Sequence, residues 1–344
     1  MSLIQDLGIQ QPLIVAPMAG GPTTPELVIA SCEAGAMGSM GAAYMTSDAI
    51  RDFAAKVRAG TNKPFSINLF VSHPQPTVTD EMLKRAVAAT QKYRDQLHLP
   101  VPTLAPPYEE NFDMQIEEVL KIKPRALSFI FGIPHRKYLT AAKAAGIHLI
   151  GTATSPQEAQ ALDQAGFDSV ILQGIESGGH RGIFDPSASD PAMTVFELLK
   201  QTRSIVQIPL IAAGGIMTRE DIQKCISLGA DAVQMGTAFL AVKEAGTSEV
   251  YRKKLLESSI RKTATTRVFS GRLARGIVNR FMEEMTDPLA ILPFQAQNKF
   301  TRDIRNASTK AGSPDFLSLW SGTGEGALWT GTTAELIANL MKGV

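Results

Sequence analysis

The chain has 344 residues, enough for one large barrel with an extra lobe or for two domains. Its 34 basic and 33 acidic residues leave a formal charge of +1, which gives no reason to expect nucleic acid or an acidic membrane as a partner. Hydrophobic residues make up 44% and charged residues 19%, which is ordinary for a globular enzyme and excludes a disordered chain.

The N-terminal residues show no basic region followed by an apolar run, so we expect no signal peptide. No apolar stretch is long enough to span a bilayer, and we expect a cytoplasmic protein. The two cysteines, Cys32 and Cys225, fall on predicted helices, and we expect buried, reduced thiols. The spacing of Cys and His residues suggests no metal site.

Eight short apolar segments alternate with predicted helices, at a spacing of roughly 25–40 residues that is typical of a (β/α)₈ TIM barrel of the α/β class. A doubly wound sheet is the competing fold, but it usually carries its glycine-rich phosphate loop after the first strand. Here the strongest glycine motifs follow the last three segments, which favours the barrel. The expected strands are 13–16, 35–40, 65–70, 126–131, 148–152, 169–172, 209–216 and 232–237.

Helix signals complete the predicted architecture. Thr24-Pro25 and Ser47-Asp48 are expected to begin helices, and a helix over 79–94 interrupts a proline-rich excursion from the barrel. A helix is also expected from Asn298 to Ser308. The amphipathic segment 332–341 is the candidate eighth barrel helix. We therefore predict a barrel of residues 1–239 and 327–344, and an inserted lobe of residues 240–326 that covers the active site.

The sixth predicted strand leads into a glycine-rich loop, residues 173–182, that carries His180. Glycines permit a tight turn and a close approach of backbone to a planar ligand, and an imidazole titrates near neutrality. His180 is thus the candidate catalytic residue, although a surface turn with a histidine is the plain alternative. Arg181 is adjacent, and neighbours on an extended segment usually point apart.

Gly214-Gly215 and Gly236-Thr237 end the seventh and eighth strands, where barrels often bind a phosphate on backbone N–H groups. Ordinary strand-end turns are the alternative. Asn68 and Gln173 also stand at strand ends, where amides can pair with a flavin ring or satisfy the loop backbone. Met18 could pack on such a ring, although a buried methionine more often belongs to a core.

Six motifs in order along the chain resemble the nitronate monooxygenase family, formerly the 2-nitropropane dioxygenases: residues 16–21, 68–70, 131–134, 176–182, 212–216 and 234–239. The resemblance implies a TIM barrel, non-covalently bound FMN, and oxidation of alkyl nitronates by O₂. It also implies that His180 is catalytic. The residues expected to hold FMN are Met18, Asn68, Gln173, Gly178, Gly179, Gly214, Gly215, Gln234, Met235, Gly236 and Thr237.

Two other functions stay open from the sequence: an FMN-dependent enoyl-acyl-carrier-protein reductase using NAD(P)H, and a redox-inert barrel that binds a sugar phosphate. The particular nitronate is also open, because segment 293–298 lacks the tyrosines of family members that oxidise propionate 3-nitronate. An anion site is one interpretation of the arginines at positions 267, 272, 275 and 280, and a solvated or salt-bridged helix face is the favoured one. The oligomeric state is not determined.

Overall fold

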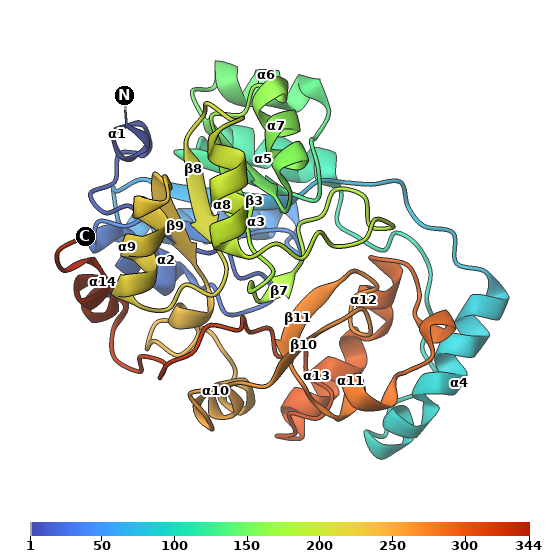
Figure 1. Ribbon diagram of the computed structural model, residues 1–344. Helices are drawn as coiled ribbons and strands as arrows, with labels where there is room; N and C mark the ends of the chain where they lie inside the picture. Colours follow the sequence, from blue (N-terminus) through green and yellow to red (C-terminus); the bar gives the residue numbers. More distant parts are fainter. Residues whose placement is uncertain (1) are drawn as a thin grey trace.

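The computed structural model describes residues 2–344 (Figure 1). Within this range eight parallel strands form the barrel, and each matches a segment that the sequence predicts. These strands are β1 (Leu13–Val15), β2 (Gly38–Gly41), β3 (Phe65–Phe70), β4 (Ala126–Ile130), β5 (His148–Ala153), β6 (Ser169–Gln173), β8 (Leu210–Ala213) and β9 (Ala232–Met235).

The sheet closes on itself. Its strand order is β1-β9-β8-β6-β5-β4-β3-β2, so β1 and β2 are the two ends. A parallel bridge between Ile14 and Met37 joins these ends, with Val15 N–H donating to Met37 at 2.9 Å and Met37 N–H donating to Leu13 at 2.9 Å. Closure leaves no edge strand exposed, which confirms the predicted barrel.

Each barrel strand is followed by one helix of the outer ring. The last of these, α14, lies against α2 and α9 and completes the ring, as its amphipathic sequence predicts. These helices are α2 (Pro25–Glu33), α3 (Ser47–Gly60), α5 (Phe112–Ile122), α6 (Arg136–Ala144), α7 (Pro156–Ala165), α8 (Val195–Arg203), α9 (Arg219–Ser227) and α14 (Thr333–Met341).

The barrel interior is filled by side chains at its amino-terminal end. Ile14, Ile150, Ile171 and Ile211 pack together there, and helix α1 (Leu3–Leu7) covers them with two buried leucines. A larger apolar layer separates the strands from the outer helices. Since the lower barrel is packed solid, any ligand site must lie at the opposite end, where the strands terminate.

A lobe lies beside the carboxyl end of the barrel, at the lower right of Figure 1. The proline-rich excursion belongs to it, because helix α4 (Asp80–Gln96) packs against its core through Tyr93, 5.0 Å from the ring of Phe281. Its other elements are α10 (Glu249–Leu256), β10 (Thr263–Thr266), β11 (Ala274–Ile277), α11 (Arg280–Glu284), α12 (Ala296–Phe300), α13 (Arg302–Lys310) and the 3₁₀ turn η2 (Pro288–Ala290). The 3₁₀ turn η1 (Thr237–Phe239) directly follows β9 and packs in the barrel core.

Three local predictions are corrected. Thr46, not Ser47, caps α3, because its hydroxyl accepts from Ala49 N–H at 3.2 Å. The single helix expected over 298–308 is two, broken at Thr301. The loop 173–182 contains a short strand, β7 (Gly179–His180), which pairs antiparallel with β11. The partner of β7 lies about ninety residues away in the chain, so local pattern could not reveal it.

Cys32 and Cys225 are buried on α2 and α9, as expected. Burial raises the pKa of the Cys32 thiol to about 11 and that of Cys225 to about 12, so both are protonated at neutral pH. Between residues 2 and 344, none of the helices combines the length and apolarity that crossing a membrane requires.

Candidate active site

A cavity of about 750 Å³ opens between the carboxyl ends of the barrel strands and the lobe. Every residue that the sequence singles out for a site lines this cavity. They are Met18, Asn68, Gln173, Gly178, Gly179, His180, Gly214, Gly215, Gln234, Met235, Gly236 and Thr237. Because they come from strands spread over the whole chain, only barrel closure brings them together.

The glycines after β8 have positive φ angles, +116° at Gly214 and +68° at Gly215. A Cβ on Gly215 would lie 2.9 Å from the Cβ of Glu176, and one on Gly214 would lie 2.6 Å from the hydroxyl of Ser177. Both glycines are therefore required by backbone conformation and by the closely packed loop beside them.

Gly236 differs from these glycines. Its φ is −112°, and an added Cβ would meet only Ala16 at 3.4 Å and Met18 at 3.8 Å, which are ordinary contacts. The backbone conformation at Gly236 therefore does not require glycine. Its N–H and that of Gly215 donate to no protein acceptor within residues 2–344. This leaves two donors free at the cavity wall.

Two hydroxyls were not predicted. Ser177 is 7% exposed, lines the cavity beside Gly214, and its Oγ has no hydrogen-bond partner in the described part of the chain. Thr247, equally buried, also lines the cavity with an unpartnered Oγ1. A buried polar atom without a partner is costly, so a ligand is the expected partner of such an atom at a cavity wall. Serine and threonine are too common for sequence alone to select these two.

The two predicted amides stand in different environments. Asn68 uses its Nδ2 on Ser128, at 2.9 Å to the hydroxyl, and its Oδ1 has no protein donor among residues 2–344. Gln173 is occupied by the loop, because its Oε1 accepts from Gly182 N–H at 2.8 Å and its Nε2 donates to the His180 carbonyl at 2.9 Å. Asn68 thus presents a free acceptor to the cavity, whereas Gln173 shapes the loop.

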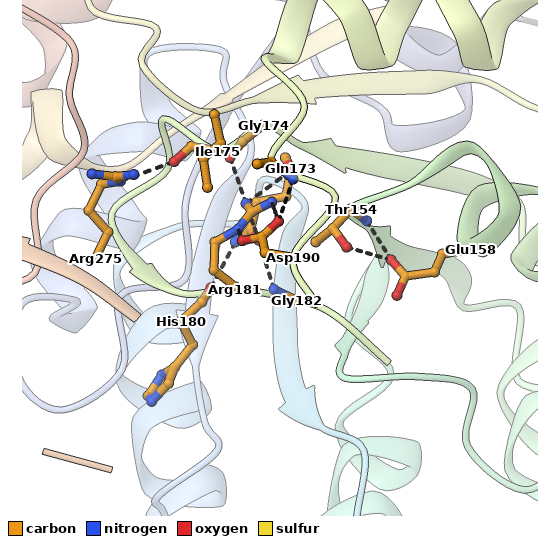
Figure 2. A network of polar contacts seen from close by, with 11 residues as sticks. Thr154, Glu158, Gln173, Gly174, Ile175, His180, Arg181, Gly182, Asp190 and Arg275 are labelled. Atoms are coloured by element: carbon orange, nitrogen blue, oxygen red, sulfur yellow. Dashed lines mark hydrogen bonds and ion pairs between the residues drawn. The ribbon is translucent and has the colours of Figure 1, made fainter. Parts of the chain in front are cut away.

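Figure 2 shows that Arg181 and His180 point in opposite directions, as the extended backbone predicts. Arg181 is 0% exposed and donates to both carboxylate oxygens of Asp190, at 2.7 and 3.1 Å. It also donates to the Gln173 and Gly174 carbonyls. Burial alone raises the Asp190 pKa, but the Arg181 guanidinium more than offsets this and the pKa is lowered. The pair holds the loop rigid and is not itself in the cavity.

His180 projects into the cavity, surrounded by the rings of Phe70, Phe131, Phe294 and Trp320, whose centroids lie 5.6–6.0 Å from that of the imidazole. Its Nε2 lies 2.8 Å from Ser270 Oγ, and its Nδ1 has no protein partner within residues 2–344. Burial, then the charges of Arg272 and Arg305, lower the pKa of His180 to about 3. The imidazole is therefore neutral at pH 7 and has one nitrogen free.

The predicted solvated or salt-bridged helix face holds for Arg280, which pairs with Glu284 on α11, and is wrong for Arg272 and Arg275. Arg272 is 2% exposed and stacks on Phe131, with its Cζ 3.9 Å from the ring centroid. Arg275 lies on β11 and donates to the Ile175 carbonyl at 3.0 Å, and only Arg280 is helical. Burial lowers the pKa of Arg272 to about 10, which leaves it charged at pH 7 beside His180.

The fold and the cavity together define a barrel enzyme whose site combines free backbone donors, a neutral histidine and an aromatic wall. The comparisons with known proteins place the chain more narrowly. A model of the nitronate monooxygenase family matches residues 2–343, and the chain belongs to that family.

Three relatives illustrate the similarity. The chain is 38% identical to a probable nitronate monooxygenase of Staphylococcus aureus (strain Newman), over 99% of this chain and 96% of that protein. The nitroalkane oxidase from Streptomyces ansochromogenes superposes with a TM-score of 0.91 at 34% identity, covering 98% of this chain and 96% of the other. FabK from Thermotoga maritima gives a TM-score of 0.75 at 26% identity, covering 99% and 95%.

Proposed function

We propose that this protein is an FMN-dependent nitronate monooxygenase, which oxidises alkyl nitronates with O₂ to a carbonyl compound and nitrite. The observation that carries the proposal is that two features line one cavity. The first is a set of unpartnered donors, the N–H groups of Gly215 and Gly236 and the Ser177 hydroxyl. The second is the neutral His180 among its aromatic neighbours.

The residues present fit FMN. A phosphate suits the donors around Gly214, Gly215, Gly236, Thr237 and Ser177, because backbone N–H groups and a hydroxyl bind phosphate oxygens without a side chain intervening. The free Asn68 Oδ1 can accept from the N–H of the flavin pyrimidine ring. Gln173, Gly178, Gly179, Gln234 and Met235 complete the wall, with Met18 against the ring. When bound, FMN would supply the redox chemistry toward the nitronate and O₂.

His180 would accept the α-proton of the substrate. A neutral nitroalkane must lose its α-proton to become a nitronate, and the free Nδ1 of His180 can accept that proton while Ser270 holds Nε2. The negative charge of the nitronate formed would raise the low pKa of the imidazole beside it. A preformed nitronate needs no proton transfer, and His180 would then only orient it. The aromatic rings around His180 would limit the access of water to the substrate.

His180→Asn keeps a polar tip and removes the base. We expect kcat/KM on a neutral nitroalkane to fall by ~10²–10⁴-fold, the usual worth of a positioned acid–base group, and to fall less on the preformed nitronate. Flavin content should stay near that of the wild type. Equal losses on both substrate forms would make His180 a binding residue, and loss of the flavin would make it a cofactor anchor.

The cofactor is tested by denaturing the purified protein and identifying the released flavin by chromatography. Gly236→Val is the matched variant, because the backbone at Gly236 accepts a Cβ while the side chain would enter the proposed phosphate site. We expect wild type to release FMN and Gly236→Val to fold but lose it. Release of FAD, or of no flavin, from the wild type would contradict the proposal.

One assay separates the proposed reaction from an enoyl reductase, whose barrel and cofactor would be the same. The holoenzyme is mixed anaerobically with NADH and, separately, with a nitronate. Bleaching of the flavin absorbance by the nitronate supports the proposal, and rapid bleaching by NADH alone indicates the reductase. A purified protein without flavin colour would instead indicate a redox-inert sugar-phosphate barrel.

A further inference from the structure

The cavity wall has an uneven distribution of charge. Its side chains include three cations, Arg302, Arg305 and Lys310, all from α13, and within residues 2–344 it includes no aspartate or glutamate. Arg302 and Lys310 are exposed at the rim, whereas Arg305 is half-buried. A cavity with this lining attracts anions, and the partly desolvated cation attracts them most strongly.

Among residues 2–344, no carboxylate forms an ion pair with Arg305. Its Nη2 donates only to Asn298, at 2.7 Å to the carbonyl and 2.9 Å to Oδ1, and its Nε is buried without a partner in the described chain. The acid of α13, Asp303, is held elsewhere, because it forms a 2.6 Å ion pair with Arg94 of α4. That pair joins α13 to α4 within the lobe and so holds the Arg305 guanidinium in place. The Nε of Arg305 remains free to donate to a ligand.

Arg305 lines the same cavity as His180, and its charge lowers the pKa of that imidazole after the effects of burial and of Arg272. Its charge also acts on Tyr44, whose ring centroid is 5.4 Å from that of Phe70, and Phe70 is in turn 6.0 Å from His180. The free donors at Gly215 and Gly236 come from the ends of β8 and β9, on different elements from this aromatic group. The cavity wall thus carries two kinds of anion-binding donor, backbone N–H groups and a guanidinium.

We propose that Arg305 recognises the anionic substrate in the cavity that His180 lines, and that it binds an oxygen of the nitronate group. This inference rests on the proposed function. A nitronate carries its negative charge on two oxygens of a planar group, which a guanidinium recognises with directed N–H donors. Binding that charge also stabilises the nitronate relative to the neutral nitroalkane, which makes the α-proton easier for His180 to remove.

The test compares three variants of the holoenzyme. Arg305→Met removes the charge and keeps the length, Arg305→Lys keeps the charge, and Arg302→Met removes an exposed cation from the same helix. Nitrate is the probe, because it is a planar anion with the nitronate's O–N–O geometry and is not a substrate. Its Kd is measured by calorimetry, alongside KM and kcat on ethyl nitronate and the flavin content.

We expect Arg305→Met to raise both the nitrate Kd and the nitronate KM by about 10–100-fold, the usual worth of a charge-assisted hydrogen bond. Arg305→Lys should recover most of the loss, and Arg302→Met should change either value by less than about 3-fold because exposed charges are screened. An unchanged nitrate Kd in Arg305→Met, an equal loss in Arg302→Met, or loss of the flavin would each overturn the assignment.

A failure of the proposed function can be distinguished from a failure of the Arg305 assignment. If the wild type oxidises no nitronate, the proposed reaction fails, but the nitrate titration still decides whether Arg305 forms an anion site. Thermal unfolding of each variant shows whether the fold is kept. If Arg305→Met does not fold, Arg305→Lys and a nitrate titration of the wild type at increasing ionic strength supply the test.

Discussion

Burial of His180 makes the stability of this protein depend on pH. The imidazole has an ordinary pKa of 6.5, which falls to about 3 in the folded protein, first through burial and then through the charges of Arg272 and Arg305. The unfolded chain therefore binds more protons than the folded one between these two values. Stability contributed by keeping His180 neutral is complete above pH 7 and is lost as the pH falls through 6.5.

The expected magnitude follows from these two pKa values. Lowering the pH from 7 to 5 protonates His180 in the unfolded chain only, which costs up to about 2 kcal/mol of folding free energy. His180→Gln removes the titration. The free energy of unfolding of the wild type should thus fall by about 2 kcal/mol more than that of His180→Gln over this range.

Urea unfolding of both proteins, as isolated, at pH 7 and pH 5 measures the effect. The difference between the proteins at pH 7 contains only the change in packing, and the change of that difference with pH contains the titration. His73 and His148, whose pKa values burial also lowers, are present in both proteins and cancel. Parallel losses of stability in the two proteins would show that His180 titrates normally and that the electrostatic argument is wrong.

Three further predictions concern the framework. Asp190→Asn leaves Arg181 buried without its counter-charge, so we expect a loss of about 3–5 kcal/mol in urea unfolding, and a loss below about 1 kcal/mol would mean that water reaches the guanidinium. Gly215→Ala forces a Cβ into a φ of +68° against Glu176, which should cost about 1–3 kcal/mol, measured by thermal unfolding. Phe281→Ala empties the core that joins α4 to the lobe, and should cost about 3–5 kcal/mol and increase proteolysis within 71–111; unchanged proteolysis would show that α4 is held otherwise.

The sequence by itself determined the barrel and the strand-end residues of the cavity wall. Strands that are buried on both faces appear in the sequence as short apolar runs, and the ring helices begin at local caps such as Thr24 and Ser155. Both signals span only a few consecutive residues, so the sequence alone reveals them. The positions of residues at the strand ends follow directly from the positions of the strands. Once the strands close into a barrel, Asn68, Gly215, Gly236 and His180 must converge.

Only the tertiary structure decided the surroundings of His180. The pairing of β7 with β11, the Ser270 contact to His180 and the burial of Arg272 all join residues about ninety positions apart. The association of α4 with α13 through Arg94 and Asp303 spans more than two hundred. Local pattern carries no information on such pairs. From sequence alone, a charged residue is expected to be solvated, because its tertiary neighbours are unknown. For this reason the burial of Arg272 was not predicted and Arg305 was not selected as a site residue.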